Sequence, residues 1–279
     1  MEAIEFKKRL GTSKLAIAAL CLVISFIALY FTLRSADKNK PDIVLETMQI
    51  GSWPYEADGT KKPIEWIILE KNKDDGTAVL LSKYAIEAKP YNAMPENTAD
   101  SKRNAIWEKS TLRKWLNDEF YNTAFNEQEK ETIENASLTN LKGKGKFTKD
   151  FVEHWQKWDI DFSGFLDESW ETSSGSDTKD KVWLLSTADI EKYTDVLALG
   201  KEMQAKPTPY TKSKAEICDS ALCKKNNAYG FCNWWLRTAG YKQDDAAYIH
   251  SDGNIYSFGM VADNEKSGTV RPAIKIRLK

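Results

Sequence analysis

The sequence predicts a globular domain of the α+β class, preceded by one N-terminal transmembrane helix. Three observations indicate this. Helical spacing of apolar residues is concentrated early, over residues 110–135. The last third of the chain is instead rich in strand patterns. Residues 15–33 contain no charged residue, Pro or Gly and stand apart from a chain whose mean hydropathy is −0.54.

Length and composition narrow the class of protein. The 279 residues correspond to one large domain or two small ones. A content of 42% hydrophobic and 29% charged residues excludes a disordered or fibrous chain. Lys and Arg number 40 against 41 Asp and Glu, so there is no basic excess to hold a polyanion over the whole chain. This balance argues against nucleic acid as the main partner.

The apolar segment 15–33 has the length of a membrane span. At about 1.5 Å per residue it covers roughly 28 Å, close to the thickness of the hydrocarbon layer. Four basic residues precede it from position 7 and three follow it up to position 40, which favours an N-terminus inside the cell. We therefore expect a single-pass protein of the cell membrane with its C-terminal domain outside the cytoplasm.

Two other interpretations of this segment fit less well. A cleaved signal peptide has a shorter apolar stretch that ends at small residues, whereas this one ends at Tyr30–Leu33. A lipoprotein signal would acylate Cys21, but Cys21 lies in the middle of the stretch and follows the large Leu20. The predicted organisation is a cytoplasmic N-terminus (1–14), a signal anchor (15–33), a tether (34–45) and an extracytoplasmic domain (46–279).

Local patterns predict the elements of this domain. A turn at 73–77 between two β-rich segments predicts a hairpin of residues 63–70 and 78–82. Ser110 is a good N-cap for the helix 110–135, and a second helical turn begins at 126–129. Thr187 or Ser186 caps a predicted helix that ends at Leu199. Further strands are predicted at 182–186, 233–236, 246–250, 255–258 and 270–278, and a short helix at 147–158.

A series of motifs occurs in the same order as in a known family of bacterial domains. It includes GSWP (51–54), PIEWIIL (63–69), FYNTAF (120–125), DKVWLLS (180–186), NWWLRTAG (233–240), AAYIHSDGNI (246–255) and GTVRPAIKIRL (268–278). Over residues 46–279 the chain resembles a bacterial family of extracytoplasmic domains of unknown function with a WWLRSPG, AAYVNSDG and GVRPAL ending. That ending is similar to the C-type-lectin-like fold, which formylglycine-generating-enzyme-like and retroelement-diversified binding domains share.

The resemblance implies a C-type-lectin-like domain with a small twisted antiparallel β core, flanking helices and long loops on one side. It implies no established activity. The chain departs from the family in three places: Thr238-Ala239 replaces Ser-Pro, the segment 140–172 is longer, and three cysteines outside the apolar segment are additional.

These three cysteines bear on the choice between binding and catalysis. Outside the cytoplasm two of them would form a disulfide, either Cys218–Cys223 or Cys223–Cys232, and the third would be buried or reactive. The formylglycine-generating relatives work through cysteines, so a Cys-dependent enzyme is an alternative function. Neither His154 nor His250 forms part of a recognisable base–nucleophile pair, which favours a protein without catalysis.

One acidic loop has the spacing of calcium ligands. Asp159, Asp161, Ser163 and Asp167 stand at positions 1, 3, 5 and 9 of an EF-hand-like loop with Gly164 at position 6. Position 12, which requires an acid, is Trp170. The loop is therefore either a Ca²⁺ site, the one cofactor the sequence indicates, or an acidic surface loop.

The loops beside the C-terminal strands are the predicted ligand-binding site, because they mix Tyr with short polar side chains. The predicted residues are Tyr241, Asp244, Asp245, Asp252, Asn254, Tyr256, Asp263 and Asn264. Arg237 and Arg271 are expected to pair with buried carboxylates or backbone carbonyls. The predicted function is non-catalytic recognition of an envelope or extracellular protein or glycan. A structural envelope or assembly protein is a further alternative.

Overall fold

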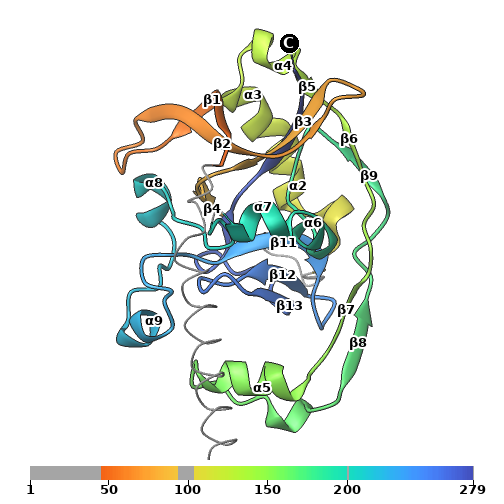
Figure 1. Ribbon diagram of the computed structural model, residues 1–279, viewed down its shortest axis with the longest axis vertical. Helices are drawn as coiled ribbons and strands as arrows, with labels where there is room; N and C mark the ends of the chain where they lie inside the picture. The colour runs from red at the N-terminus through yellow and green to blue at the C-terminus, as the bar shows by residue number, and fades with distance from the viewer. Residues whose placement is uncertain (1–44, 94–103, 200, 279) are drawn as a thin grey trace, which may run out of the picture. The chain divides into compact units, whose positions relative to one another are not determined.

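The computed structural model describes residues 45–93, 104–199 and 201–278, which form one unit with its own hydrophobic core (Figure 1). The predicted anchor at 15–33 and nearly all of the tether lie outside these residues. Within the described part of the chain, no helix is long and apolar enough to cross a bilayer.

The first of two large sheets has six strands and is antiparallel throughout. Its strands are β1 (Thr47–Pro54), β2 (Lys61–Asn72), β3 (Thr77–Ser82), β15 (Ala273–Arg277), β10 (Val182–Trp183) and β5 (Ile133–Glu134). The order is β1-β2-β3-β15-β10, and β5 also pairs with β15. The predicted hairpin is confirmed as β2–β3, with Asn72 opposite Thr77.

The second sheet has five strands. They are β13 (Ile255–Val261), β12 (Asp245–Ile249), β11 (Trp234–Ala239), β14 (Thr269–Val270) and β4 (Glu87–Ala88). Every residue of β11 is buried, in keeping with its largely apolar sequence WWLRTA. β14 runs parallel to β11, and two residues later the chain enters β15, so the VRP segment links the two sheets.

Two short ribbons follow the helical region. One pairs β6 (Ala136–Leu138) with β9 (Thr178–Asp180), and the other pairs β7 (Gly143–Lys146) with β8 (Ser169–Thr172). Between β7 and β8 lie α5 (Lys149–Gln156) and a 3-10 turn, η3 (Ser163–Phe165). Phe151 and Trp155 of α5 pack on Phe258 and Tyr256 of β13, with ring centroids 5.3 and 4.4 Å apart. The long 140–172 segment therefore has an aromatic core that it shares with the second sheet.

The remaining helices are short. They are η1 (Trp107–Lys109), α2 (Thr111–Trp115), the π-helical η2 (Leu116–Phe120), α3 (Tyr121–Ala124), α4 (Glu127–Lys130), α6 (Thr187–Lys192), α7 (Thr194–Leu199), α8 (Pro209–Lys212) and α9 (Ala221–Lys225). Ser110 caps α2 as predicted, since its hydroxyl accepts from the Arg113 amide at 3.1 Å. The predicted helix 110–135 stops at Ala124, because Phe125 is extended and Asn126 starts α4 with a capping box.

The predicted fold class is wrong. The described chain is a mixed α/β structure made mostly of strands, with few helices, and the longest of these has eight residues. It is not a single small antiparallel core flanked by helices, since two large sheets share the core and one strand pair is parallel. The helical periodicity between 110 and 135 is real, but it is divided among short segments that contribute Leu112, Leu116 and Phe120 to the core.

Candidate functional site

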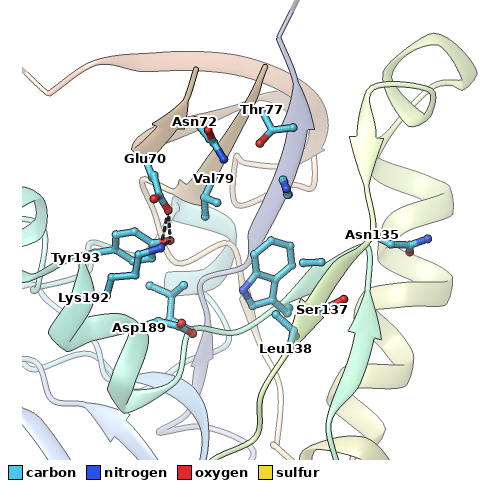
Figure 2. A pocket seen from close by; sticks show the side chains of 14 residues that line it. Glu70, Asn72, Thr77, Val79, Asn135, Ser137, Leu138, Asp189, Lys192 and Tyr193 are labelled. Atoms are coloured by element: carbon cyan, nitrogen blue, oxygen red, sulfur yellow. Dashed lines mark hydrogen bonds and ion pairs between the residues drawn. The ribbon is translucent and has the colours of Figure 1, made fainter. Parts of the chain in front are cut away.

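A polar pocket of about 490 Å³ lies against one face of the six-stranded sheet. β2, β3 and β15 form its floor, α6 forms one wall, and the β5–β6 segment forms the other (Figure 2). Its lining consists of Glu70, Asn72, Thr77, Val79, Asn135, Ala136, Ser137, Leu138, Trp183, Leu185, Asp189, Lys192, Tyr193 and Lys275. We call this the sheet pocket.

One wall of the sheet pocket carries a hydrogen-bonded trio. Glu70 Oε2 accepts from Lys192 Nζ at 2.7 Å and from the Tyr193 hydroxyl at 2.9 Å (Figure 2). The bond from Lys192 lowers the pKa of Glu70, and the same bond raises the pKa of Lys192. Burial raises the pKa of Tyr193 to about 12. At neutral pH the trio therefore holds one carboxylate, one ammonium and one neutral hydroxyl in fixed positions.

The opposite wall carries unpaired polar groups. Asn135 and Ser137 are exposed, and their side chains form no hydrogen bond with any residue that the structure describes. Figure 2 shows them at the side of the pocket remote from the trio, with the Asn135 amide directed away from it. Leu138, Trp183 and Leu185 lie between the two walls and are nearly buried, so only their edges are open to the pocket. A ligand in the pocket can thus exchange hydrogen bonds with the trio and, at the rim, with the polar groups of the opposite wall.

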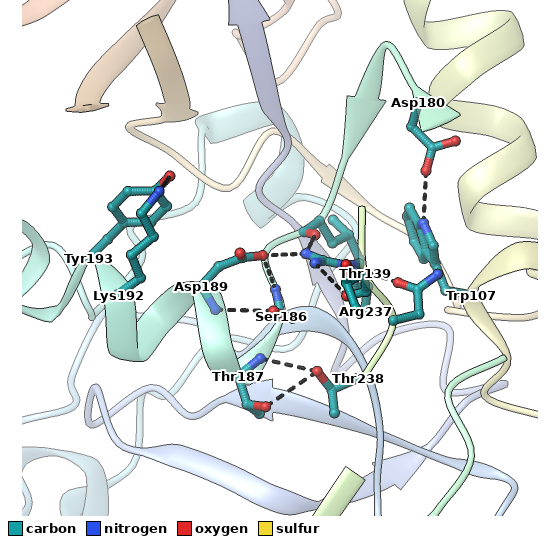
Figure 3. Close-up of polar contacts among 12 residues, drawn as sticks. Trp107, Thr139, Asp180, Ser186, Thr187, Asp189, Lys192, Tyr193, Arg237 and Thr238 are labelled. Carbon is teal, nitrogen blue, oxygen red and sulfur yellow. Dashed lines mark hydrogen bonds and ion pairs between the residues drawn. The ribbon is translucent and has the colours of Figure 1, made fainter. Parts of the chain in front are cut away.

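The wall formed by α6 is fixed by a buried arginine. Ser186 caps α6, and Asp189 completes the capping box by accepting from the Ser186 amide at 2.8 Å. The same Asp189 carboxylate binds the Arg237 guanidinium (Figure 3). Arg237 also donates to the Leu184 carbonyl at 2.9 Å and to Asn140 Oδ1 at 3.1 Å. The expected pairing of Arg237 is confirmed, and it positions the helix that carries Lys192.

A second contact with β11 holds the start of α6. The Thr238 hydroxyl accepts from the Thr187 amide at 3.0 Å (Figure 3). Thr238 belongs to β11 and is buried. Its hydroxyl thus satisfies one of the amides that are left unpaired at a helix N-terminus.

None of the predicted ligand-binding residues lines the sheet pocket. Tyr241, Asp244 and Asp245 lie at the β11–β12 connection, where the Tyr241 hydroxyl donates to Glu168 and its ring packs on Phe147 at 5.4 Å. Asp263 and Asn264 follow β13, and Asn264 Oδ1 accepts from the Ser267 amide at 2.8 Å within a local turn. The two loops adjoin, because the Ala262 amide donates to the Asp244 carbonyl at 2.8 Å.

The other three predicted residues lie at the β12–β13 turn and belong to an unpredicted cluster. Asp252 Oδ2 lies 3.1 Å from His154 Nε2 and accepts from the Tyr256 hydroxyl at 3.2 Å and from Trp158 Nε1 at 3.3 Å. His250 Nδ1 lies 3.2 Å from the other carboxylate oxygen. This oxygen also accepts from the Asn254 amide at 3.0 Å.

Burial alone would raise the pKa of Asp252, but the hydrogen bond from His250 and that from the Asn254 amide outweigh it, and the net pKa is lowered. Burial, followed by the charge of Asp252, raises the pKa of Tyr256. The cluster is therefore an ionised carboxylate surrounded by donors. It joins α5 and the following loop to the second sheet, and we interpret it as structural.

Asp245 provides a test of pH dependence. Burial, followed by the charge of Asp244, raises its pKa to about 6, whereas an unfolded Asp titrates near pH 4. Between these pH values the folded state holds a proton that the unfolded state has lost, so stability falls as the pH rises. We expect Asp245→Asn to raise the free energy of unfolding by about 1 kcal/mol at pH 7, after allowance for solvent screening, and to have no effect at pH 4.

Urea unfolding at the two pH values measures this difference. Asp244→Asn is the control, because it removes the neighbouring charge and should give a smaller gain of the same sign. A gain from Asp245→Asn that is equal at pH 4 and pH 7 would contradict the titration.

The predicted calcium ligands have local partners. Asp161 accepts from the Ser163 amide at 2.9 Å, and Asp167 pairs with Lys146 at 2.7 Å. Asp159 has a positive φ of 58° at the end of the turn that follows α5. Over the described ranges, no three His, Cys, Asp or Glu side chains are placed to hold a metal ion.

Among the cysteines that the structure describes, Cys218 and Cys223 form a disulfide, which confirms that a disulfide is present and selects between the two pairings. Cys232 is free and buried, and its thiol donates to the Ala205 carbonyl at 3.4 Å. Burial raises the pKa of Cys232 to about 12. A thiol in this state is not a nucleophile at neutral pH, which weighs against the Cys-dependent alternative.

Comparison with known protein families gives a match over most of the described domain. The model of a family described as "Domain of unknown function (DUF6273)" matches residues 75–156 and 162–278. The gap between the two matched ranges falls within the long 140–172 segment. No curated protein and no solved structure matches the chain.

Proposed function

The chain belongs to the family described as Domain of unknown function (DUF6273), and on that premise we propose a non-catalytic binding function for it. The family brings no activity with it, so the proposal depends on the sheet pocket. We propose that the ligand of the sheet pocket is a neutral glycan and that the domain acts on the outer side of the cell membrane.

The balanced chemistry of the sheet pocket supports this ligand. Glu70 and Asp189 are offset by Lys192 and Lys275, so the lining has no net charge to attract an ion. Amides and hydroxyls at Asn72, Asn135, Ser137 and Tyr193 can donate and accept. Sugar hydroxyls also do both, and the C–H face of a sugar ring suits apolar surface. A volume of about 490 Å³ lies in the usual range for small-ligand sites.

Two observations support a location outside the cytoplasm. The apolar segment 15–33 has the length and flanking charges of a signal anchor. The Cys218–Cys223 disulfide is typical of an oxidising compartment. Both fit recognition of a glycan at the cell envelope.

The test is binding of full-length protein, purified in a neutral detergent, to an array of neutral and acidic glycans, followed by calorimetry on the strongest neutral ligand. We expect Asn135→Ala with Ser137→Ala to weaken binding at least about tenfold, because a site built for hydrogen bonds loses them. Both residues are exposed, so folding should be unchanged.

Tyr241→Phe is the matched control, because it removes a hydroxyl from the loops that the sequence indicated and leaves the sheet pocket intact. It should bind as the parent protein does. The proposal fails if no neutral glycan binds, if the pocket variant binds normally, or if Tyr241→Phe shows the greater loss.

A further inference from the structure

A second surface pairs lysines with aromatic rings. Lys62 Nζ lies 4.5 Å from the ring centroid of Tyr55, Lys206 Nζ lies 5.9 Å from that of Phe231, and Lys224 Nζ lies 4.7 Å from that of Tyr229. All three lysines are exposed, and Tyr229 is 51% exposed. We call these residues the lysine–aromatic surface. None of them lines the sheet pocket.

Backbone contacts join the parts of this surface. The Tyr210 amide of α8 donates to the Tyr55 carbonyl at 2.9 Å, so α8 packs against the β1–β2 hairpin. The Cys232 amide donates to the Ala205 carbonyl at 3.0 Å, which brings Phe231 beside Lys206. In Figure 1, α8 and α9 lie on the same side of the picture as the tip of this hairpin.

A groove of about 210 Å³ adjoins this surface and shares Tyr55 and Lys62 with it. The rings of Tyr55 and Tyr84 meet edge-to-face there, with centroids 6.1 Å apart, and Pro54 and Pro63 extend the apolar lining. Thr208, two residues after Lys206, lines the groove as well. A groove is concave, so it suits an extended chain better than it suits a flat surface.

The charge of the surface is only partly balanced. Lys62 pairs with Glu56. Lys206 and Lys224 have no carboxylate within ion-pair distance in the part of the chain that the structure describes. A ring beneath each ammonium attracts it and restricts its position, while its remaining N–H groups can bind an anion from solvent.

We infer that this surface binds an acidic polysaccharide chain. Sugar rings lie against Tyr55 and Tyr84, and the carboxylates of the chain contact Lys206 and Lys224. This function is separate from the neutral-glycan pocket and does not depend on it. A flat anionic bilayer would contact the lysines but would not enter the groove, so charge and shape together favour the polymer.

The experiment is titration of the full-length protein, in neutral detergent, with polygalacturonate. We expect binding that weakens as salt rises from 50 to 300 mM, and Lys206→Gln with Lys224→Gln to weaken it at least about fivefold and reduce its salt dependence. The matched control is Lys144→Gln with Lys179→Gln, which removes the same charge from exposed lysines of β7 and β9. It should bind as the parent does.

Three outcomes would overturn the inference. They are absence of binding to polygalacturonate, an equal loss in the two double variants, or tighter binding to vesicles of phosphatidylglycerol than to the polymer. The Asn135→Ala and Ser137→Ala variant should bind polygalacturonate normally. An experiment that contradicts the acidic-polysaccharide surface can therefore be distinguished from one that contradicts the neutral-glycan pocket.

Discussion

Replacing Arg271 with Met should lower the free energy of unfolding by about 3 to 5 kcal/mol. Arg271 is fully buried, with its guanidinium 5.1 Å from the Trp234 ring centroid. It donates to the Ser82 carbonyl at 2.7 Å, to the Glu202 carbonyl, and to Glu202 Oε2 at 3.1 Å. Methionine fills the space but has no donors, so two carbonyls and one carboxylate lose their partner in the core.

The position of Arg271 in the chain makes the effect large. It lies between β14 of the second sheet and β15 of the first, and it binds segments 189 and 69 residues away. Burial lowers its pKa to about 10, which still leaves it charged at neutral pH. Urea unfolding monitored by tryptophan fluorescence measures the loss.

Arg277→Met is the control for Arg271→Met. Arg277 belongs to β15 but its side chain is 66% exposed, and its ion pair with Glu134 is at the surface. Such pairs contribute between about 0 and 1 kcal/mol. If both variants lost the same stability, burial of the guanidinium would not explain the effect of Arg271.

Features that depend on neighbouring residues could be predicted from the sequence. The hairpin 63–82, the cap at Ser110, a cap at Ser186 or Thr187, and the presence of a disulfide depend on residues a few positions apart. The sequence could predict that the two buried arginines pair with acceptors, because a buried guanidinium needs them. It could not predict which residues accept, since Asp189 and Glu202 are remote in sequence from Arg237 and Arg271.

The prediction of the fold class was wrong for a related reason. Periodicity predicts which residues face the core, but not whether a helix continues through a residue such as Phe125. It also does not predict which strands pair. β15 lies between β3 and β10, and β14 between β11 and β4, which are pairings over long separations. These long-range pairings build two large sheets, whereas the prediction was one small antiparallel core.

The candidate sites illustrate the same limit. Glu70 and Lys192 are 122 residues apart, and His154 is 98 residues from Asp252. Each histidine taken alone gave no signal of a site. The lysine–aromatic surface combines the β1–β2 hairpin, the segment before α8 that carries Lys206, and α9 with the loop that follows it. These segments are far apart in the sequence, and none of them predicts the position of another.

Gly143→Ala should be the most disruptive change of a single methyl group in the long 140–172 segment. A Cβ at Gly143 would lie 1.9 Å from the carbonyl oxygen of Ala239. That oxygen belongs to the backbone of buried β11, so it has no rotamer by which to move away. The β7–β8 ribbon must therefore shift off the sheet, and overpacking of this kind costs about 1 to 3 kcal/mol or more.

A matched substitution separates this clash from the general effect of removing a glycine. Gly164 lies in η3 of the same segment, and a Cβ there would meet no atom within 4 Å. Gly164→Ala should therefore leave stability unchanged or raise it slightly, because alanine restricts the unfolded chain. Urea unfolding gives the two free energies, and near-ultraviolet circular dichroism reports on the packing of Phe147, Phe151 and Trp155.

The near-ultraviolet circular dichroism signal shows which strand shifts in Gly143→Ala. If the ribbon shifts, Gly143→Ala loses part of the near-ultraviolet signal, because α5 is connected to β7 and packs on β13 through its aromatic rings. A stability loss with an unchanged aromatic signal would mean that β11 yields instead of the ribbon. Equal stability of the two alanine variants would show that β7 does not pack on Ala239 as closely as the structure places it.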